Sequence, residues 1–157
     1  MLRPGICQGV FGPLVLFSAL LEPCAAGRAD ADEYKETIAR VLRLLPRQPD
    51  KVVVVDAESG TLPLRDTPQR VEAFVTHGQR VVYLVRQGVT LQRALKGPGI
   101  FDYALAIVIW HEMAHIEGAD EPKARREEED LWRQFVVARR VDSAIGLNYL
   151  ALLRKRR

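Results

Sequence analysis

The pattern of apolar and polar positions predicts an N-terminal helix followed by short strands. Apolar residues recur every three or four positions over residues 31–45, which is the spacing of an amphipathic helix. β-branched residues are concentrated in residues 51–57 and 79–88, as is typical of strands. Residues 70–78 are ambiguous between strand and helix. Up to residue 88, the pattern therefore predicts one helix and a few strands.

The pattern after residue 88 is mainly helical. Residues 101–117 contain no proline or glycine, Asp102 can cap their start, and Gly118 can end them. Their ALAIVIW stretch is apolar on all sides, so this helix is expected at the centre of the fold. A second helix is expected over residues 120–140, and a short final helix after a break near Gly146. The order of helix, strands and helical hairpin predicts an α+β fold.

Composition and charge favour one globular domain without a nucleic-acid partner. The chain has 157 residues, enough for one domain, and its 48% apolar content argues against disorder. The net charge is +3, and the basic cluster is the terminal run Arg154–Arg157. Nucleic-acid binders concentrate their excess of basic residues on one face. We interpret a short terminal run as a solvated end.

Residues 1–26 have the pattern of an export signal. Residues 10–21 form an apolar stretch that is too short to span a bilayer, and small residues precede a cleavage position before Gly27. This predicts a secreted or periplasmic protein with a single domain over residues 27–157 and no stable membrane span after cleavage. An uncleaved anchor and a lipoprotein cut at Cys24 are the alternatives.

The cysteines limit the kind of metal site that the exported chain can form. Cys7 and Cys24 both lie in the predicted signal, so the mature chain would have no cysteine. A disulfide framework and a cysteine zinc site are then excluded. Any metal ion must be held by histidine and carboxylate side chains.

The sequence HEMAH has the spacing of a zinc site. His111 and His115 lie four residues apart, so their imidazoles share one helix face and can bind one ion. Glu112 is one helical step away and can exchange protons with a water on the metal. A histidine pair on a solvated surface is the alternative, but the apolar helix around it favours the metal.

Glu121 is one candidate for the third ligand. It follows His111 by ten residues with Gly118 between them, a spacing similar to the metzincin pattern with Glu in place of the third His. The methionine turn of metzincins is absent, because the chain has only Met1 and Met113. Glu121 also fits as a charge that stabilises a helix N-terminus.

Glu128 is the candidate that the helical pattern favours. At about 100° per residue it lies in the middle of the apolar face of its helix, while Glu127 and Glu129 fall on the two flanks. A carboxylate on a buried face is costly unless it is paired or binds a metal. In a hairpin that turns at Gly118, Glu128 comes level with His111. Glu127, Glu129 and Asp130 fit a solvated acidic run.

The motif and the following glutamate resemble the gluzincin metallopeptidases over about residues 79–140. In that group a glutamate on a later helix completes the zinc site. The resemblance implies a small zincin-like domain that acts on peptides or proteins, with residues 79–88 as the edge strand that aligns the substrate. It implies Zn²⁺ bound by His111, His115 and Glu128, with Glu112 as general base and then general acid.

The sequence therefore predicts an exported zinc-dependent peptidase that hydrolyses peptide bonds with a metal-activated water. A non-catalytic zincin-like metal-binding protein and a structural or interaction domain without metal are the alternatives. Such an enzyme needs a group that stabilises the oxyanion. Tyr149, His77 and Arg139 are the candidates, and the sequence does not select among them.

Overall fold

The described part of the chain forms five helices and a small mixed sheet, which confirms the predicted α+β fold class. The computed structural model describes residues 26–56, 71–76 and 78–155. His77 and nearly all of the predicted export signal lie outside these ranges. The elements are α1 (Ala26–Leu42), β1 (Lys51–Val55), β2 (Ala73–Val75), β3 (Val81–Val85), α2 (Val89–Ala94), α3 (Ile100–Ile116), α4 (Glu121–Val137) and α5 (Ser143–Lys155).

The described sheet has the strand order β1-β3-β2. Tyr83 of β3 pairs with Val53 of β1 in parallel and with Phe74 of β2 in antiparallel register. The ambiguous segment therefore contributes a strand, because β3 offers its backbone groups on both sides. The expectation that residues 79–88 form an edge strand is wrong, since β3 is central. Within the described residues, β2 is the edge beside α3.

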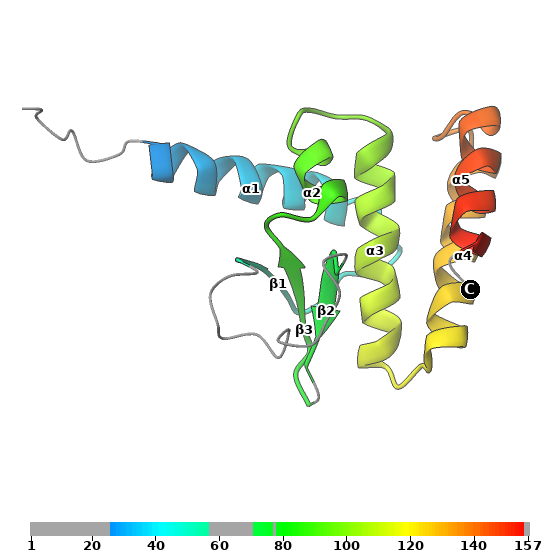
Figure 1. Ribbon diagram of the computed structural model, residues 1–157, viewed down its shortest axis with the longest axis horizontal. Helices are drawn as coiled ribbons and strands as arrows, with labels where there is room; N and C mark the ends of the chain where they lie inside the picture. The colour runs from blue at the N-terminus through cyan, green and yellow to red at the C-terminus, as the bar shows by residue number, and fades with distance from the viewer. Residues whose placement is uncertain (1–25, 57–70, 77, 156–157) are drawn as a thin grey trace, which may run out of the picture.

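Helix α3 lies between the sheet and the pair α4 and α5 (Figure 1). Leu105, Ile107 and Ile109 are at most 1% exposed although they point in different directions around the helix. The apolar character on all sides of this segment explains its central place, as the sequence predicted. None of the helices in the described ranges has the length and apolar character needed to cross a membrane.

A buried ion pair joins the first three helices at the N-terminal end of α3. Arg40 of α1 donates from Nε and a terminal nitrogen to the two carboxylate oxygens of Asp102, at 2.9 and 3.0 Å. The same terminal nitrogen donates to the carbonyl of Ala94 at the end of α2. The backbone N–H of Gly99 donates to Asp102. This carboxylate therefore helps to start α3, as predicted, and also ties α1 to it.

The second helical hairpin differs from the prediction at Gly146. Helix α4 ends at Val137, the chain turns through Arg139 with a φ of 55°, and α5 runs through Gly146 without a break. A Cβ at Gly146 would overlap Cγ2 of Val136. The carbonyl of Gly146 accepts a hydrogen bond from Nε1 of Trp132 at 2.8 Å. Glycine is present here because two helices approach closely, which the local sequence does not reveal.

Candidate metal centre

The two histidines of the HEMAH segment lie on the C-terminal turns of α3 and face each other. The rings meet edge to face with their centroids 4.8 Å apart. Nε2 of His115 lies 3.1 Å from Nε2 of His111. This convergence follows from the helix geometry, because residues four apart are neighbours on one face.

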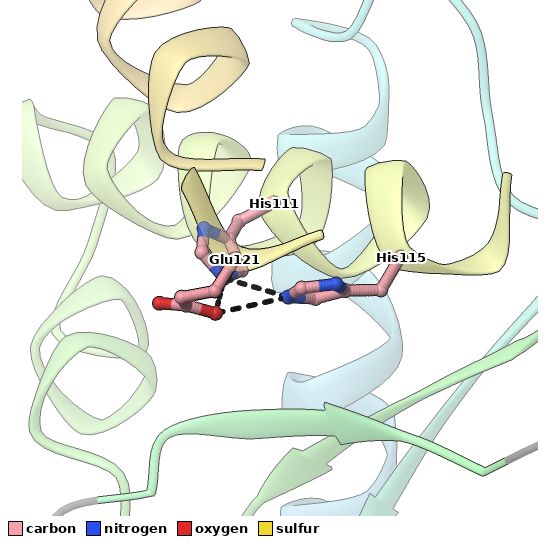
Figure 2. Close-up of side chains that lie close together, drawn as sticks. All are labelled: His111, His115 and Glu121. Atoms are coloured by element: carbon pink, nitrogen blue, oxygen red, sulfur yellow. Dashed lines mark hydrogen bonds and ion pairs between the residues drawn. The ribbon is translucent and has the colours of Figure 1, made fainter. Parts of the chain in front are cut away.

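Glu121 is the carboxylate that the fold brings to both rings (Figure 2). Gly118 adopts a φ of +85° between α3 and α4, which lets the chain reverse direction there. The side chain of Asp120 caps α4 by accepting a hydrogen bond from the backbone of Lys123 at 2.9 Å. Glu121 is the first residue of α4, and this cap directs its carboxylate back toward the histidines.

The three converging atoms form a small triangle. Oε2 of Glu121 lies 3.2 Å from Nε2 of His115 and 3.4 Å from Nε2 of His111. The third side, between the two Nε2 atoms, is 3.1 Å. Metal–ligand bonds of about 2.0–2.1 Å in tetrahedral geometry separate ligand atoms by about 3.3–3.4 Å. The triangle thus has the dimensions of one face of a zinc coordination tetrahedron.

Hydrogen bonds at the other ring nitrogens determine which atoms can bind a metal. Nδ1 of His115 donates to the carbonyl of Ala119 at 2.9 Å, because a carbonyl can only accept. Nδ1 of His111 lies 3.2 Å from Oε2 of Glu128, and a carboxylate also accepts. When the rings are neutral, both Nε2 atoms are then left with a lone pair directed at Glu121. Two lone pairs and a negative charge repel one another unless a cation or a proton lies between them.

Glu128, which the helical pattern favoured as third ligand, lies on the opposite side of the His111 ring from Glu121. Its side chain is only 14% exposed, so it is largely buried as predicted, although the neighbouring Glu129, at 7%, is buried more deeply. The structure does not bring Glu128 to the two Nε2 atoms. Its contact with Nδ1 is the arrangement in which a carboxylate orients a metal-binding histidine.

Glu127 and Glu129 of α4 are less exposed than a solvated acidic run would be. The side chain of Glu129 is only 7% exposed and accepts a hydrogen bond from Arg133 at 3.1 Å. Solvation was therefore the wrong interpretation for Glu129. Leu153 of α5 and Glu129 line the same cavity, so this flank of α4 faces the space next to α5. Glu127 is partly buried and lines neither of the cavities next to the histidines.

Glu112 lies beside the triangle. Burial raises the pKa of its carboxyl, an effect that positive charge on His111 and His115 partly opposes. Glu112 lines both cavities that adjoin the histidines, and none of the described residues hydrogen-bonds to its side chain. A partly buried carboxyl with a raised pKa is suited to accept and return a proton near neutral pH.

Neighbouring charges shift the pKa values of His111 and Glu121 in opposite directions. Burial lowers the pKa of His111, but the hydrogen bond and charge of Glu128 and the charges of Glu112 and Glu121 raise it overall. Burial raises the pKa of Glu121, but the hydrogen bond from Arg125 and the charge of His111 lower it overall. Glu121 is thus held in its ionised form, which is the form that binds a metal.

Two adjoining cavities give access to the site. The larger, of about 810 Å³, extends along β2 and past Arg80, and the smaller, of about 380 Å³, lies against α4. Both are lined by His111, Glu112 and Glu121, so the triangle lies where the two meet. The smaller cavity is strongly acidic, with a lining that includes Glu72, Glu112, Glu121, Glu128 and Glu129.

The proposed oxyanion groups do not come to the site within the described part of the chain. Tyr149 packs on the ring of Trp132, with centroids 4.4 Å apart, and neither it nor Arg139 lines the two cavities. His77 lies outside the described residues. The cationic groups in the linings are Arg80 and Arg125, which sequence reasoning did not single out. The position of Arg125 one turn after Glu121 was the available signal.

Comparison with known proteins gives no relative. No family model, no curated protein and no solved structure matches the chain. The resemblance to gluzincins therefore depends on the HEMAH motif, since Glu128 does not reach the two Nε2 atoms.

Proposed function

We propose that the protein is an exported zinc-dependent peptidase of the zincin type. Zinc would be held by His111, His115 and Glu121, with Glu128 orienting His111. This set combines the glutamate ligand of gluzincins with a spacing similar to that of metzincins. The proposal replaces Glu128 by Glu121 as third ligand, because Glu121 is the carboxylate that reaches both Nε2 atoms.

The observation that carries the proposal is the convergence of three ligand atoms on one point. Each side of the triangle is 3.1–3.4 Å, and each histidine has its Nδ1 engaged, so that Nε2 faces the centre. A hydrogen-bonded histidine cluster without metal would need an extra proton between the two Nε2 atoms. A divalent cation relieves the same repulsion and satisfies all three groups.

Glu112 supplies the proton transfer in this proposal. A bound zinc ion polarises a carbonyl and makes water acidic enough to attack it near neutral pH. The carboxylate of Glu112 would accept a proton from the attacking water and would then donate it to the departing amine. Burial at the meeting point of the two cavities keeps this carboxyl close to the reacting groups and raises its pKa.

The substrate would be an extended segment of a peptide or protein. β2 is an edge strand of the described sheet, and Ala73 and Val75 of this strand line the larger cavity. An extended peptide can add to such an edge by main-chain hydrogen bonds. A basic residue near the cleaved bond would suit the acidic smaller cavity.

The test compares the native protein with Glu112→Gln. Hydrolysis of a fluorogenic peptide mixture that includes Lys and Arg should fall at least about 100-fold, because the proton acceptor is lost. Zinc content by elemental analysis should be unchanged, since Glu112 is not a proposed ligand. The exposed Glu117→Gln is the matched control and should keep full activity. Equal activity of Glu112→Gln and the native protein would contradict the proposed role.

A zincin-like metal-binding protein without turnover is the second candidate. The observation that favours it concerns the oxyanion, which a peptidase must stabilise with a group in the site. Both cationic groups in the described cavity linings are already paired with carboxylates. Nε of Arg80 lies 3.1 Å from Asp50, and Nε of Arg125 lies 2.6 Å from Glu121. Stoichiometric zinc together with no hydrolysis by the native protein would favour this candidate. Less than about half an equivalent of zinc would exclude both.

A further inference from the structure

The outward face of α5 is apolar and is not covered by any described residue. The inward side chains Leu150 and Leu153 are each 6% exposed and belong to the core. Ile145, Leu147 and Leu152 are 52%, 63% and 57% exposed. Single exposed apolar residues are ordinary on protein surfaces, but three on one short helix are not.

The exposed residues of α5 form a continuous face. With Ile145 at 0° and about 100° per residue, Leu152 lies near −20°, Ala151 near −120° and Leu147 near −160°. Ala144 falls within the same arc and is exposed. Over residues 144–152, Asn148 is the one polar side chain in this arc. The helix is therefore apolar on the core side and over most of its solvent side.

The sequence around this face is strongly basic. Residues 138–157 contain one acidic side chain, Asp142. The same residues contain six basic ones, two before the helix and four at its end: Arg139, Arg140, Arg154, Lys155, Arg156 and Arg157. The whole chain has a net charge of only +3, so the remainder is slightly acidic. Along the sequence, the excess positive charge therefore falls on both sides of the apolar residues of α5.

We propose that α5 docks on an anionic lipid bilayer, with the helix in the plane of the interface. Apolar side chains such as Ile145 and Leu152 would enter the boundary between headgroups and acyl chains. The basic residues at both ends would contact lipid phosphates, as basic clusters on amphipathic helices do. This inference does not depend on the proposed peptidase activity, since it uses a different face of the molecule.

Charge favours an anionic bilayer over the two other binding partners considered for this face, a second copy of the chain and a nucleic acid. A second copy of the chain would bring an equally basic segment against the first, and the two would repel each other. A nucleic acid would neutralise the basic residues but would leave Ile145, Leu147 and Leu152 in water, because phosphate contacts need no apolar face. An anionic bilayer satisfies the basic ends and the apolar face at the same time.

Flotation of the full chain with lipid vesicles tests the proposal. Binding to vesicles with 30% phosphatidylglycerol in phosphatidylcholine should exceed binding to pure phosphatidylcholine and should weaken at 500 mM salt. Replacing the four terminal basic residues by Gln should reduce partitioning at least about tenfold. The variant Ile145→Ser/Leu147→Ser/Leu152→Ser should lose binding to a similar extent.

A control with the same change in net charge guards against a general charge effect. It replaces four exposed basic residues outside α5 and should keep native binding: Arg43→Gln, Lys96→Gln, Lys123→Gln and Arg126→Gln. Using the full chain in every case makes any contribution of residues 10–21 common to all samples. Circular dichroism checks that each variant is folded. If the triple serine variant is not folded, the two charge variants still test the bilayer proposal.

Several outcomes would overturn the proposal. The first is equal binding to the two kinds of vesicle. The second is an equal loss of vesicle binding in the control variant and in the variant with the four terminal basic residues replaced by Gln. Native binding by a folded serine variant would show that the apolar face is not used. A dimer in sedimentation velocity that the serine substitutions convert to a monomer would assign the face to self-association. Binding to an oligonucleotide without binding to anionic vesicles would assign the basic residues to nucleic acid.

Discussion

Each imidazole of the candidate metal centre has one nitrogen engaged by an acceptor and the other directed at the common centre. For His115 the acceptor is a backbone carbonyl, and for His111 it is the carboxylate of Glu128. Such partners determine the tautomer and the ring orientation of a metal-binding histidine. The distinction between a glutamate that binds the metal and one that orients a ligand can be tested residue by residue.

Zinc affinity should separate Glu121 from Glu128. Glu121→Ala removes a proposed ligand and should weaken zinc binding by more than about 100-fold, whereas Glu128→Gln should weaken it by about 10–100-fold. Competition with a fluorescent chelator measures both. Glu127→Gln is the matched control on the same helix and should bind as the native protein does. A larger loss in the Glu128 variant would restore Glu128 as the ligand.

At the scale of elements, the hairpin of α4 and α5 depends on a close approach at one residue. Gly146 lies in a helix, where alanine would ordinarily be more stabilising by about 0.5–1 kcal/mol. The overlap of a new Cβ with a methyl group of Val136 reverses this preference, because the β-branched valine side chain has little rotamer freedom in a helix. Trp132, which is fully buried, also depends on this approach for its hydrogen bond to the Gly146 carbonyl.

Gly146→Ala should therefore lower the free energy of unfolding by about 1–3 kcal/mol, as overpacked positions do. Urea denaturation followed by tryptophan fluorescence measures the change. The double variant Gly146→Ala/Val136→Ala removes the overlapping methyl groups and should be less destabilised than Val136→Ala and Gly146→Ala added together. Stabilisation by Gly146→Ala alone would show that the helices separate without cost.

At the scale of the whole molecule, the candidate site joins α3 to α4 across the Gly118 turn. Zinc bound there would stabilise the folded state, because the unfolded chain does not hold the three ligands together. At a free zinc concentration about 100 times the dissociation constant, the expected gain is about 2.7 kcal/mol. For a chain of this length that corresponds to a rise in Tm of roughly 5–11 °C.

Thermal denaturation with zinc and with a chelator measures this rise. The variant His115→Ala should show no zinc-dependent change in Tm, since it lacks one ligand. A native protein with the same Tm under both conditions would contradict a metal centre at this place. A rise that persists in His115→Ala would assign the stabilising metal to other residues.

The sequence by itself determined the features that depend on local period. The α+β class follows from the helical spacings and the β-branched runs, and the central helix follows from its apolar character on all sides. The shared face of His111 and His115 follows from their spacing of four residues. The buried position of Glu128 also follows from such a spacing. These features could be predicted because a helix or strand places its side chains by its own geometry.

Only the tertiary structure decided which surfaces meet. The turn at Gly118 brings Glu121 rather than Glu128 to both Nε2 atoms, and the pairing of β3 on two sides makes it central and β2 an edge strand. The burial of Glu129 and the exposure of Ile145 also depend on how the helices pack. Such contacts join residues through the relative placement of whole elements, and no local spacing encodes that placement.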